Sequence, residues 1–271
     1  MKLALPFAKS ASAASRERTL RAVAALGALL LAACGNNTTQ VSAANAEGLM
    51  TAGKSALQAA TLSDEEVVQL SERSCAEVDA SSKIAAPKSK YALRLAKIVK
   101  GMPKEVNGVS INYKVYETKE VNAWAMNNGC VRIYSGLMDL MKDDEVRGVV
   151  GHEIGHVALG HSKKAMQVAY AAGAARQVAA ASGNSAVAAL SSSDIGAIAE
   201  KLVNAQFSQA QESAADDYAF DLLTAAKLKR EGLVTAFEKL AKQGDNSSML
   251  SSHPSSSDRA QHMRERIAAK K

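Results

Sequence analysis

One five-residue motif constrains this chain more than any other feature, His-Glu-Ile-Gly-His at residues 152–156. Two histidines four residues apart lie on one face of an α-helix, where both imidazoles can ligate one ion. Glu153 lies on the adjacent face, close enough to receive a proton from water bound to that ion. The motif is short and also arises by chance, so the alternative is an amphipathic helix with two incidental histidines.

The flanking sequence favours a real helix around the motif. Residues 145–151 are largely apolar with helical spacing, and residues 157–159 continue the pattern. Three glycines nevertheless lower the helix propensity of this segment: Gly148, Gly151 and Gly155. Close packing against a sheet would explain why they are kept, so we expect a buried helix on a sheet.

A catalytic zinc site needs a third protein ligand and one open position. His161 follows His156 by five residues, not by the six of the metzincin pattern, so we expect it to cap the helix C-terminus as a cation or hydrogen-bond donor. No carboxylate occurs between Glu153 and Asp194, which excludes a third ligand placed as in thermolysin. The ligand must come from further along the chain.

The downstream carboxylates that could supply this ligand are Glu200, Glu212, Asp216 and Asp217. Glu212 and Asp216 are four residues apart and share a helix face. One of them could bind the metal while the other orients a ligating histidine. Each could instead be an ordinary solvated carboxylate, so the residues alone leave the choice open.

The N-terminus is expected to be a lipoprotein signal peptide, residues 1–33. This segment has five basic residues against one acidic residue, a net charge of +4 out of +6 for the whole chain. An uncharged apolar run at 22–33 follows the basic residues, as in secretory signals, and is short for a membrane span. It ends in Leu-Ala-Ala-Cys-Gly, which resembles a bacterial lipobox with Cys34 as the lipidated residue. The alternative is an ordinary buried cysteine after an apolar helix.

The predicted lipoprotein signal also bears on the location and the partners of the protein. Position 35 is Gly rather than Asp, which by resemblance to known sorting signals favours the outer membrane, facing the periplasm. Polar and small residues at 34–60 predict a lipid-anchored tether before a domain at 61–271. Because the pI of about 9.1 is due partly to the signal, we expect no nucleic-acid partner.

Two cysteines remain in the predicted mature domain, Cys75 and Cys130. An exported chain folds in an oxidising compartment, so a disulfide between them is expected. The alternative is two separate thiols, since an even count by itself proves little.

Local patterns predict an α+β fold that is mainly helical. Only 4% of residues are aromatic and alanine is abundant, which favours helices packed through small side chains. Helices are expected at 63–82, 91–100, 135–141, around the motif, at 194–222 (either straight or bent) and after 257. Strands are expected at 109–115, 121–126 and 130–134, with a turn at 127–129. The alanine-rich stretch 165–190 is either a lid over the site or a plain packed helical hairpin.

Four ordered motifs resemble one known family. They are residues 152–156, Glu212-Ser-Ala-Ala-Asp216, His253-Pro254 with Arg259, and the strand at 121–125. Together they resemble the CAAX prenyl protease/HtpX-like zinc metallopeptidases, over roughly residues 60–265. The lipobox points to their soluble periplasmic branch, the LoiP-like lipoproteins. One departure is the turn Asn-Asn-Gly at 127–129, where that family has a proline.

The resemblance implies a fold and a set of roles. The fold is a zincin-type (gluzincin) metalloprotease domain with a small sheet whose edge strand binds substrate, through Asn122, Ala123, Trp124 and Ala125. One Zn²⁺ per chain is held by His152, His156 and Glu212. Asp216 supports these ligands, His253 stabilises the oxyanion, and Arg259 buttresses the region of His253.

The expected function is a zinc-dependent endopeptidase of the bacterial envelope that cleaves unfolded or misfolded proteins. Zinc polarises the scissile carbonyl, and Glu153 takes the water proton and delivers it to the leaving amine. One alternative is a zinc-stabilised chaperone or adaptor lipoprotein without proteolytic activity. Another is a structural lipoprotein without metal. Expected partners are unfolded envelope proteins, and the membrane through the N-terminal lipid.

Overall fold

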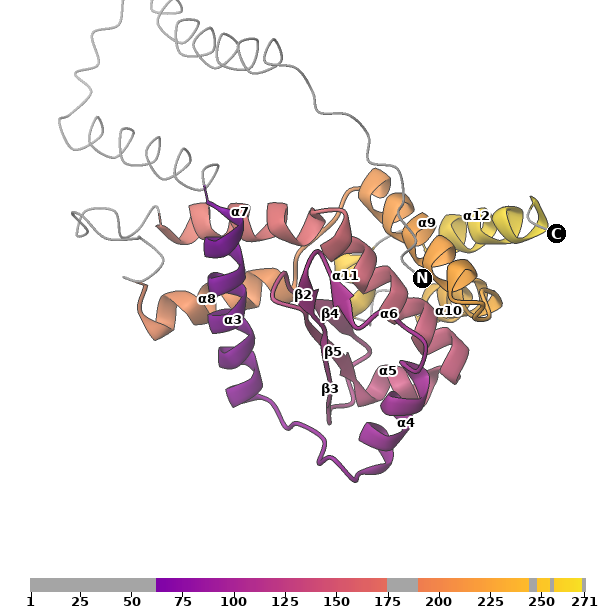
Figure 1. Ribbon diagram of the computed structural model, residues 1–271, viewed down its shortest axis with the longest axis horizontal. Helices are drawn as coiled ribbons and strands as arrows, with labels where there is room; N and C mark the ends of the chain where they lie inside the picture. The colour runs from indigo at the N-terminus through magenta and orange to yellow at the C-terminus, as the bar shows by residue number, and fades with distance from the viewer. Residues whose placement is uncertain (1–61, 175–189, 244–247, 254–255, 270–271) are drawn as a thin grey trace, which may run out of the picture. The chain divides into compact units, whose positions relative to one another are not determined.

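The helix that carries the motif lies between a small sheet and a group of C-terminal helices (Figure 1). The structure, a computed structural model, describes residues 62–174, 190–243, 248–253 and 256–269. The predicted signal peptide, Cys34, the whole of the predicted tether and residues 175–189 lie outside the described residues, so their predictions stay predictions. None of the helices in the described ranges is long and apolar enough to span a bilayer.

The described helices follow the predicted α+β order with three additions. Their bounds are α3 Asp64–Ser81, α4 Lys90–Ile98, α5 Ser135–Leu140, α6 Asp143–Ala158, α7 His161–Ala174, α8 Ser192–Val203, α9 Gln209–Ala225, α10 Glu231–Gln243, α11 Ser248–Ser252 and α12 Ser256–Ala269. The sequence analysis had not predicted α7 as a defined helix, α10 or α11. The start of α3 is as predicted, because the Ser63 hydroxyl accepts from the Glu66 amide while the Glu66 carboxylate accepts from the Ser63 amide.

The three-stranded sheet has the order β3-β5-β4, from β3 Asn112–Tyr116, β4 Ala123–Ala125 and β5 Cys130–Tyr134. Strand β3 runs parallel to β5, and β4 runs antiparallel to β5. The predicted hairpin at 121–134 is therefore confirmed, although β4 is shorter than expected. Asn122 lies just before β4, and its carbonyl still accepts from the Tyr134 amide at 3.0 Å.

The single strand predicted at 109–115 is wrong. Residues Val109–Ser110 form β2, which pairs with β1, Glu105–Val106, in a separate two-stranded hairpin. Asn107 and Gly108 turn this hairpin with φ of 51° and 79°. The alternating pattern at 109–115 is divided between two strands, because β2 pairs with β1 whereas β3 pairs with β5.

The prediction of one helix at 194–222, either straight or bent, is also wrong. It is two helices, α8 and α9, separated by residues 204–208. The Ser208 hydroxyl accepts from the Gln211 amide and so begins α9 afresh. The break lets α9 pack along α6 while α8 packs against α3 and α7.

The motif glycines face helices rather than the predicted sheet. A Cβ on Gly155 would lie 2.9 Å from the Ala215 carbonyl oxygen, and one on Gly151 would lie 3.3 Å from the Ala219 Cβ. Gly148 is similarly close to α10. Because the α6 residues in this contact are glycines and the facing α9 residues are alanines, the two helices pack closely together. This close packing places the carboxylates of α9 beside the motif.

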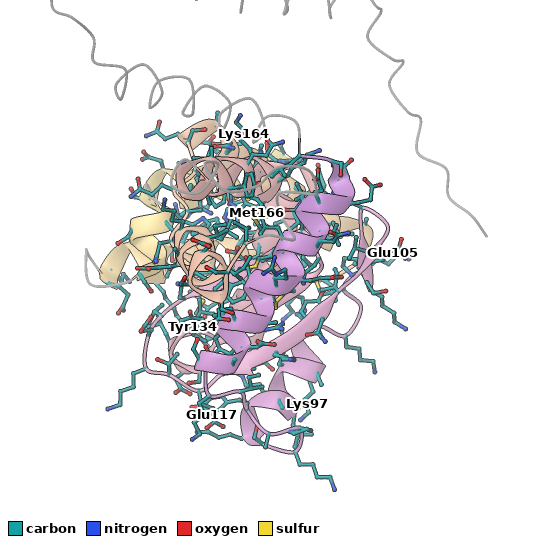
Figure 2. The ribbon with its side chains drawn as sticks, turned by 90° about the vertical axis from the view of Figure 1, so that its left-hand side faces the viewer. Lys97, Glu105, Glu117, Tyr134, Lys164 and Met166 are labelled. Carbon is teal, nitrogen blue, oxygen red and sulfur yellow. A yellow bond between two sulfur atoms is a disulfide. The ribbon has the colours of Figure 1, made fainter. Side chains whose placement is uncertain are left out.

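The described residues have one large apolar core and two smaller ones. The large core lies among the sheet, α4, α5, α6, α9, α10 and α12. A second core joins α3, α7 and α8, through residues such as Leu70, Met166 and Ile198 (Figure 2). The third surrounds the disulfide and includes Trp124 and Tyr134. The layer formed by α3, α7 and α8 thus has its own small core and is attached to the sheet.

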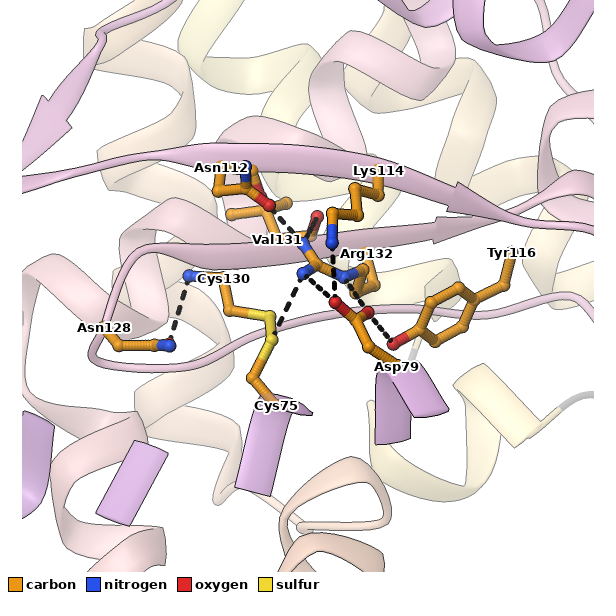
Figure 3. The surroundings of a disulfide bond; sticks show 9 residues. All are labelled: Cys75, Asp79, Asn112, Lys114, Tyr116, Asn128, Cys130, Val131 and Arg132. Atoms are coloured by element: carbon orange, nitrogen blue, oxygen red, sulfur yellow. Dashed lines mark hydrogen bonds and ion pairs between the residues drawn. A yellow bond between two sulfur atoms is a disulfide. The ribbon is translucent and has the colours of Figure 1, made fainter. Parts of the chain in front are cut away.

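Figure 3 shows the Cys75–Cys130 disulfide that joins α3 to β5. This agrees with the predicted pairing. Beside it, Arg132 of β5 donates two hydrogen bonds to Asp79 of α3, at 2.8 and 2.9 Å. A covalent link and a charged link therefore hold α3 against the same strand.

Candidate metal centre

Four buried side chains converge beside the motif: His152, His156, Glu212 and His253. One potential ligand atom from each lies within 4.8 Å of all the others. The two motif histidines approach with their Nε2 atoms 3.0 Å apart. Glu212 Oε1 is 3.3 Å from His156 Nε2, and Oε2 is 3.6 Å from His152 Nε2. This is the convergence of two imidazoles and a distant carboxylate that the sequence led us to expect.

The structure separates the carboxylates that the spacing alone left open. Glu212, on the first turn of α9, faces the two histidines and is buried. Glu200 is exposed on α8, and Asp217 pairs with Arg266 near the surface. Asp216 lies one turn after Glu212 on the same helix, but its carboxylate contacts Nδ1 of His152, not the Nε2 that faces Glu212.

On the side of His152, a buried ionic chain orients the imidazole. Its Nδ1 lies 2.8 Å from Asp216 Oδ1, and its Nε2 faces the ligand group. Arg259 of α12 grips Asp216 through two hydrogen bonds of 2.8 and 2.7 Å. Its Nη1 also lies 2.6 Å from Glu212 Oε2. Arg259 thus contacts the ligand group directly, whereas the resemblance had placed it as a buttress for the region of His253.

On the side of His156, the contacts are neutral. His161 Nδ1 lies 3.0 Å from His156 Nδ1, and the Phe207 ring stacks on the imidazole with centroids 3.8 Å apart. Neither contact was predicted. The five-residue spacing of His161 hinted at the first, whereas Phe207, just before α9, carries no local signal.

The predicted capping role of His161 is wrong. Helix α6 ends at Ala158, and the chain turns at Gly160, whose φ of 76° suits glycine and whose amide donates to the Val157 carbonyl. His161 instead begins α7. Burial lowers the pKa of His161, so it does not act as a cation on the end of α6.

Glu153 is buried next to the ligand group without being part of it. Its Oε1 has no hydrogen-bond partner among the described residues and lies 3.6 Å from His253 Nε2. Burial raises the pKa of Glu153 to about 7. A carboxylate with such a pKa can both accept and release a proton near neutral pH.

The protonation of the convergent side chains suits zinc. Burial lowers the pKa of His152 well below its ordinary value and that of His156 to about 4, so both rings are neutral. Burial alone would raise the pKa of Glu212, but hydrogen bonds with His156 and His253 hold it well below its usual range. Two neutral imidazoles and an ionised carboxylate form a donor set that binds Zn²⁺.

Strand β4 lies at the edge of the sheet, close to Glu153. A pocket is lined by β4 residues together with Glu153 and His253, and Met166 of α7 and Leu202 of α8 also line it. In the antiparallel ladder, the bonds of Asn122 and Met126 to β5 leave the backbone groups of Ala123 and Ala125 on the outer edge. The predicted edge strand therefore lies where an extended peptide would pass the convergent residues.

Comparison with known sequences agrees with this geometry. Residues 89–267 match the sequence profile of Peptidase family M48. The chain belongs to this family. It is 53% identical over 227 residues to Metalloprotease LoiP of Escherichia coli (strain K12), covering 83% of this chain and 90% of that protein. It is 52% identical over 225 residues to Metalloprotease YcaL of the same strain, covering 82% and 88%.

A shorter match extends to more distant members. Protease HtpX of Pseudomonas fluorescens (strain Pf0-1) is 33% identical over 81 residues, 28% of each chain. Family membership and the buried donor set together make this M48 peptidase a zinc metalloprotease. Membership in a peptidase family argues against an adaptor without proteolytic activity, and the buried donor set argues against a structural lipoprotein without metal.

Proposed function

We propose that this M48 peptidase is an envelope endopeptidase that cleaves unfolded or misfolded proteins, with zinc held by His152, His156 and Glu212. The observation that carries the proposal is the buried convergence of these three side chains beside an edge strand and beside Glu153, whose Oε1 accepts no hydrogen bond from the described residues. Three protein ligands leave the open coordination position that a catalytic site needs.

The side chains around the ligands divide the chemistry between them. Zinc, when bound, supplies a Lewis acid that polarises the scissile carbonyl and makes water more acidic. Glu153 takes the proton of the attacking water and later gives it to the leaving amine, which its raised pKa permits. His253, with its Nε2 near Glu153, donates a hydrogen bond to the carbonyl oxygen as negative charge develops on it.

The edge strand explains the proposed preference for unfolded chains. An extended substrate would add to β4 through the Ala123 carbonyl and the Ala125 amide, since the Ala123 amide already donates to Asn122 and the Ala125 carbonyl already accepts from Ser162. Such pairing reads the backbone more than the side chains, and a folded protein seldom offers a free extended segment. Unfolded or misfolded envelope proteins are therefore the proposed substrate class.

The proposed location rests on the N-terminal sequence. The basic residues, the apolar run at 22–33 and the Cys34 context are those of a lipoprotein signal. We propose that lipid on Cys34 anchors the protein to the outer membrane, facing the periplasm. Labelling with palmitate should mark the wild type, whereas Cys34→Ser should lose the label and leave the membrane fraction; retention of label by this variant would contradict the anchor.

Zinc analysis combined with casein cleavage tests the enzymatic proposal. The purified wild type should hold one zinc per chain and cleave unfolded casein, and a chelator should stop cleavage. Glu153→Gln should keep its zinc and lose cleavage by about 10²–10⁴-fold, the usual contribution of a general acid–base. Glu200→Gln is the matched control, since Glu200 is exposed on α8. Full activity of Glu153→Gln would overturn the proposed role of this residue.

A further inference from the structure

We infer that His161 is a positioning residue for the zinc site, holding His156 in the tautomer and orientation that ligate the metal. The inference rests on the proposed ligand role of His156. It starts from the 3.0 Å approach of the two Nδ1 atoms. Their ring centroids lie 5.1 Å apart with the planes 63° apart, so the rings meet edge to face rather than stacking.

The direction of this hydrogen bond follows from the chemistry of the imidazole. His156 Nε2 faces His152 and Glu212, so a ligating His156 must keep the lone pair of Nε2 free. A neutral ring then carries its proton on Nδ1. Nδ1–H therefore donates to His161 Nδ1, which must offer a lone pair and carry its own proton on Nε2.

Two contacts together fix the orientation of the His156 ring. Stacking on Phe207, with the planes 25° apart, holds the plane of the imidazole. The hydrogen bond to His161 then holds the direction of Nε2 within that plane. Both contacts come from outside α6, since His161 begins α7 and Phe207 precedes α9.

Asp216 plays the corresponding part for His152, so the two ligand histidines have different supports. His152 lies against a buried carboxylate, whereas His156 donates to a half-buried imidazole. Such outer partners typically change metal affinity by about 10–100-fold when they are removed. His161 is therefore expected to contribute to zinc affinity without touching the metal.

Two substitutions of His161 separate hydrogen bonding from packing. His161→Asn places an acceptor oxygen near the position of Nδ1, whereas His161→Phe keeps a ring of similar size without an acceptor. His262→Phe is the control, because the imidazole of His262 pairs with Asp217 rather than with a proposed ligand. Zinc dissociation constants are measured by competition with a chromophoric chelator, and melting curves show that each variant is folded.

We expect His161→Phe to weaken zinc binding by about 10–100-fold, with His161→Asn and His262→Phe close to the wild type. A role in packing alone predicts the reverse order for the two His161 variants. Wild-type zinc affinity in His161→Phe would overturn this inference and leave the proposed function standing. A wild type that binds no zinc would overturn both.

Discussion

Two buried arginines form similar ion pairs in two parts of the molecule, with different consequences. Arg132 grips Asp79 at the junction between α3 and β5, and Arg259 grips Asp216 beside the candidate zinc ligands. Each guanidinium donates two hydrogen bonds to one carboxylate, at distances between 2.7 and 2.9 Å. Each pair also joins elements that are far apart in sequence.

The two pairs differ in the other side chains that each carboxylate contacts. Asp79 is half-buried and accepts further hydrogen bonds from Lys114 and Tyr116, so it ties a helix to the sheet. Asp216 is fully buried, and its Oδ1 lies 2.8 Å from Nδ1 of His152. The same chemical pair therefore attaches a layer in one place and orients a proposed metal ligand in the other.

The largest effect is expected when Asp216 loses its charge. Asp216→Asn leaves the buried Arg259 without the charged carboxylate that accepts two hydrogen bonds from it, which should cost about 3–5 kcal/mol of stability. It also weakens the support of His152, so zinc affinity should fall by about 10–100-fold. Urea unfolding and zinc competition measure the two effects. Normal zinc affinity in this variant would contradict the proposed role of Asp216 in supporting His152.

The disulfide is expected to reinforce the Arg132 junction alone. Replacing both Cys75 and Cys130 by serine should lower stability by about 2–4 kcal/mol, because the unfolded chain regains the freedom of a long loop. Zinc affinity should stay unchanged, since neither cysteine contacts the ligand group. Urea unfolding with and without reductant checks the first result. Loss of zinc at full folding would show that the two regions are coupled.

A smaller loss is expected for Asp79→Asn. The half-buried site admits water to replace part of the lost interaction, so stability should fall by about 1–3 kcal/mol, as for other hydrogen bonds to charged groups. Its zinc affinity and casein cleavage should match the wild type under folding conditions. Equal losses of zinc in Asp79→Asn and Asp216→Asn would mean that the two pairs do not differ in role.

The smallest effect is a dependence of stability on pH. Burial alone would raise the pKa of Asp79, but hydrogen bonds from Arg132, Lys114 and Tyr116 lower it well below its ordinary value. A lowered folded-state pKa stabilises the protein above the unfolded-state pKa, near 4, and this contribution disappears as pH falls through the folded-state pKa. The stability difference between wild type and Asp79→Asn, measured in urea, should therefore shrink below about pH 4. A constant difference would contradict this assignment.

Short-range patterns were sufficient for part of the fold and the centre of the site. The spacing of His152 and His156 fixes both on one helix face whatever surrounds them, and the capping residues of α3 act within one turn. The hairpin β4–β5 and its turn were equally local. Family resemblance, rather than spacing, was needed to select Glu212 and to single out His253.

The sequence by itself determined the chemistry of residues 152–156, because helix geometry places side chains four residues apart on one face. Only the tertiary structure decided that the motif glycines meet α9, that α8 and α9 are separate, and that His161 and Phe207 hold His156. These features depend on which distant segments pack together. Packing between elements is set by the whole core rather than by the pattern of any one segment, so a local reading of the chain could not supply it.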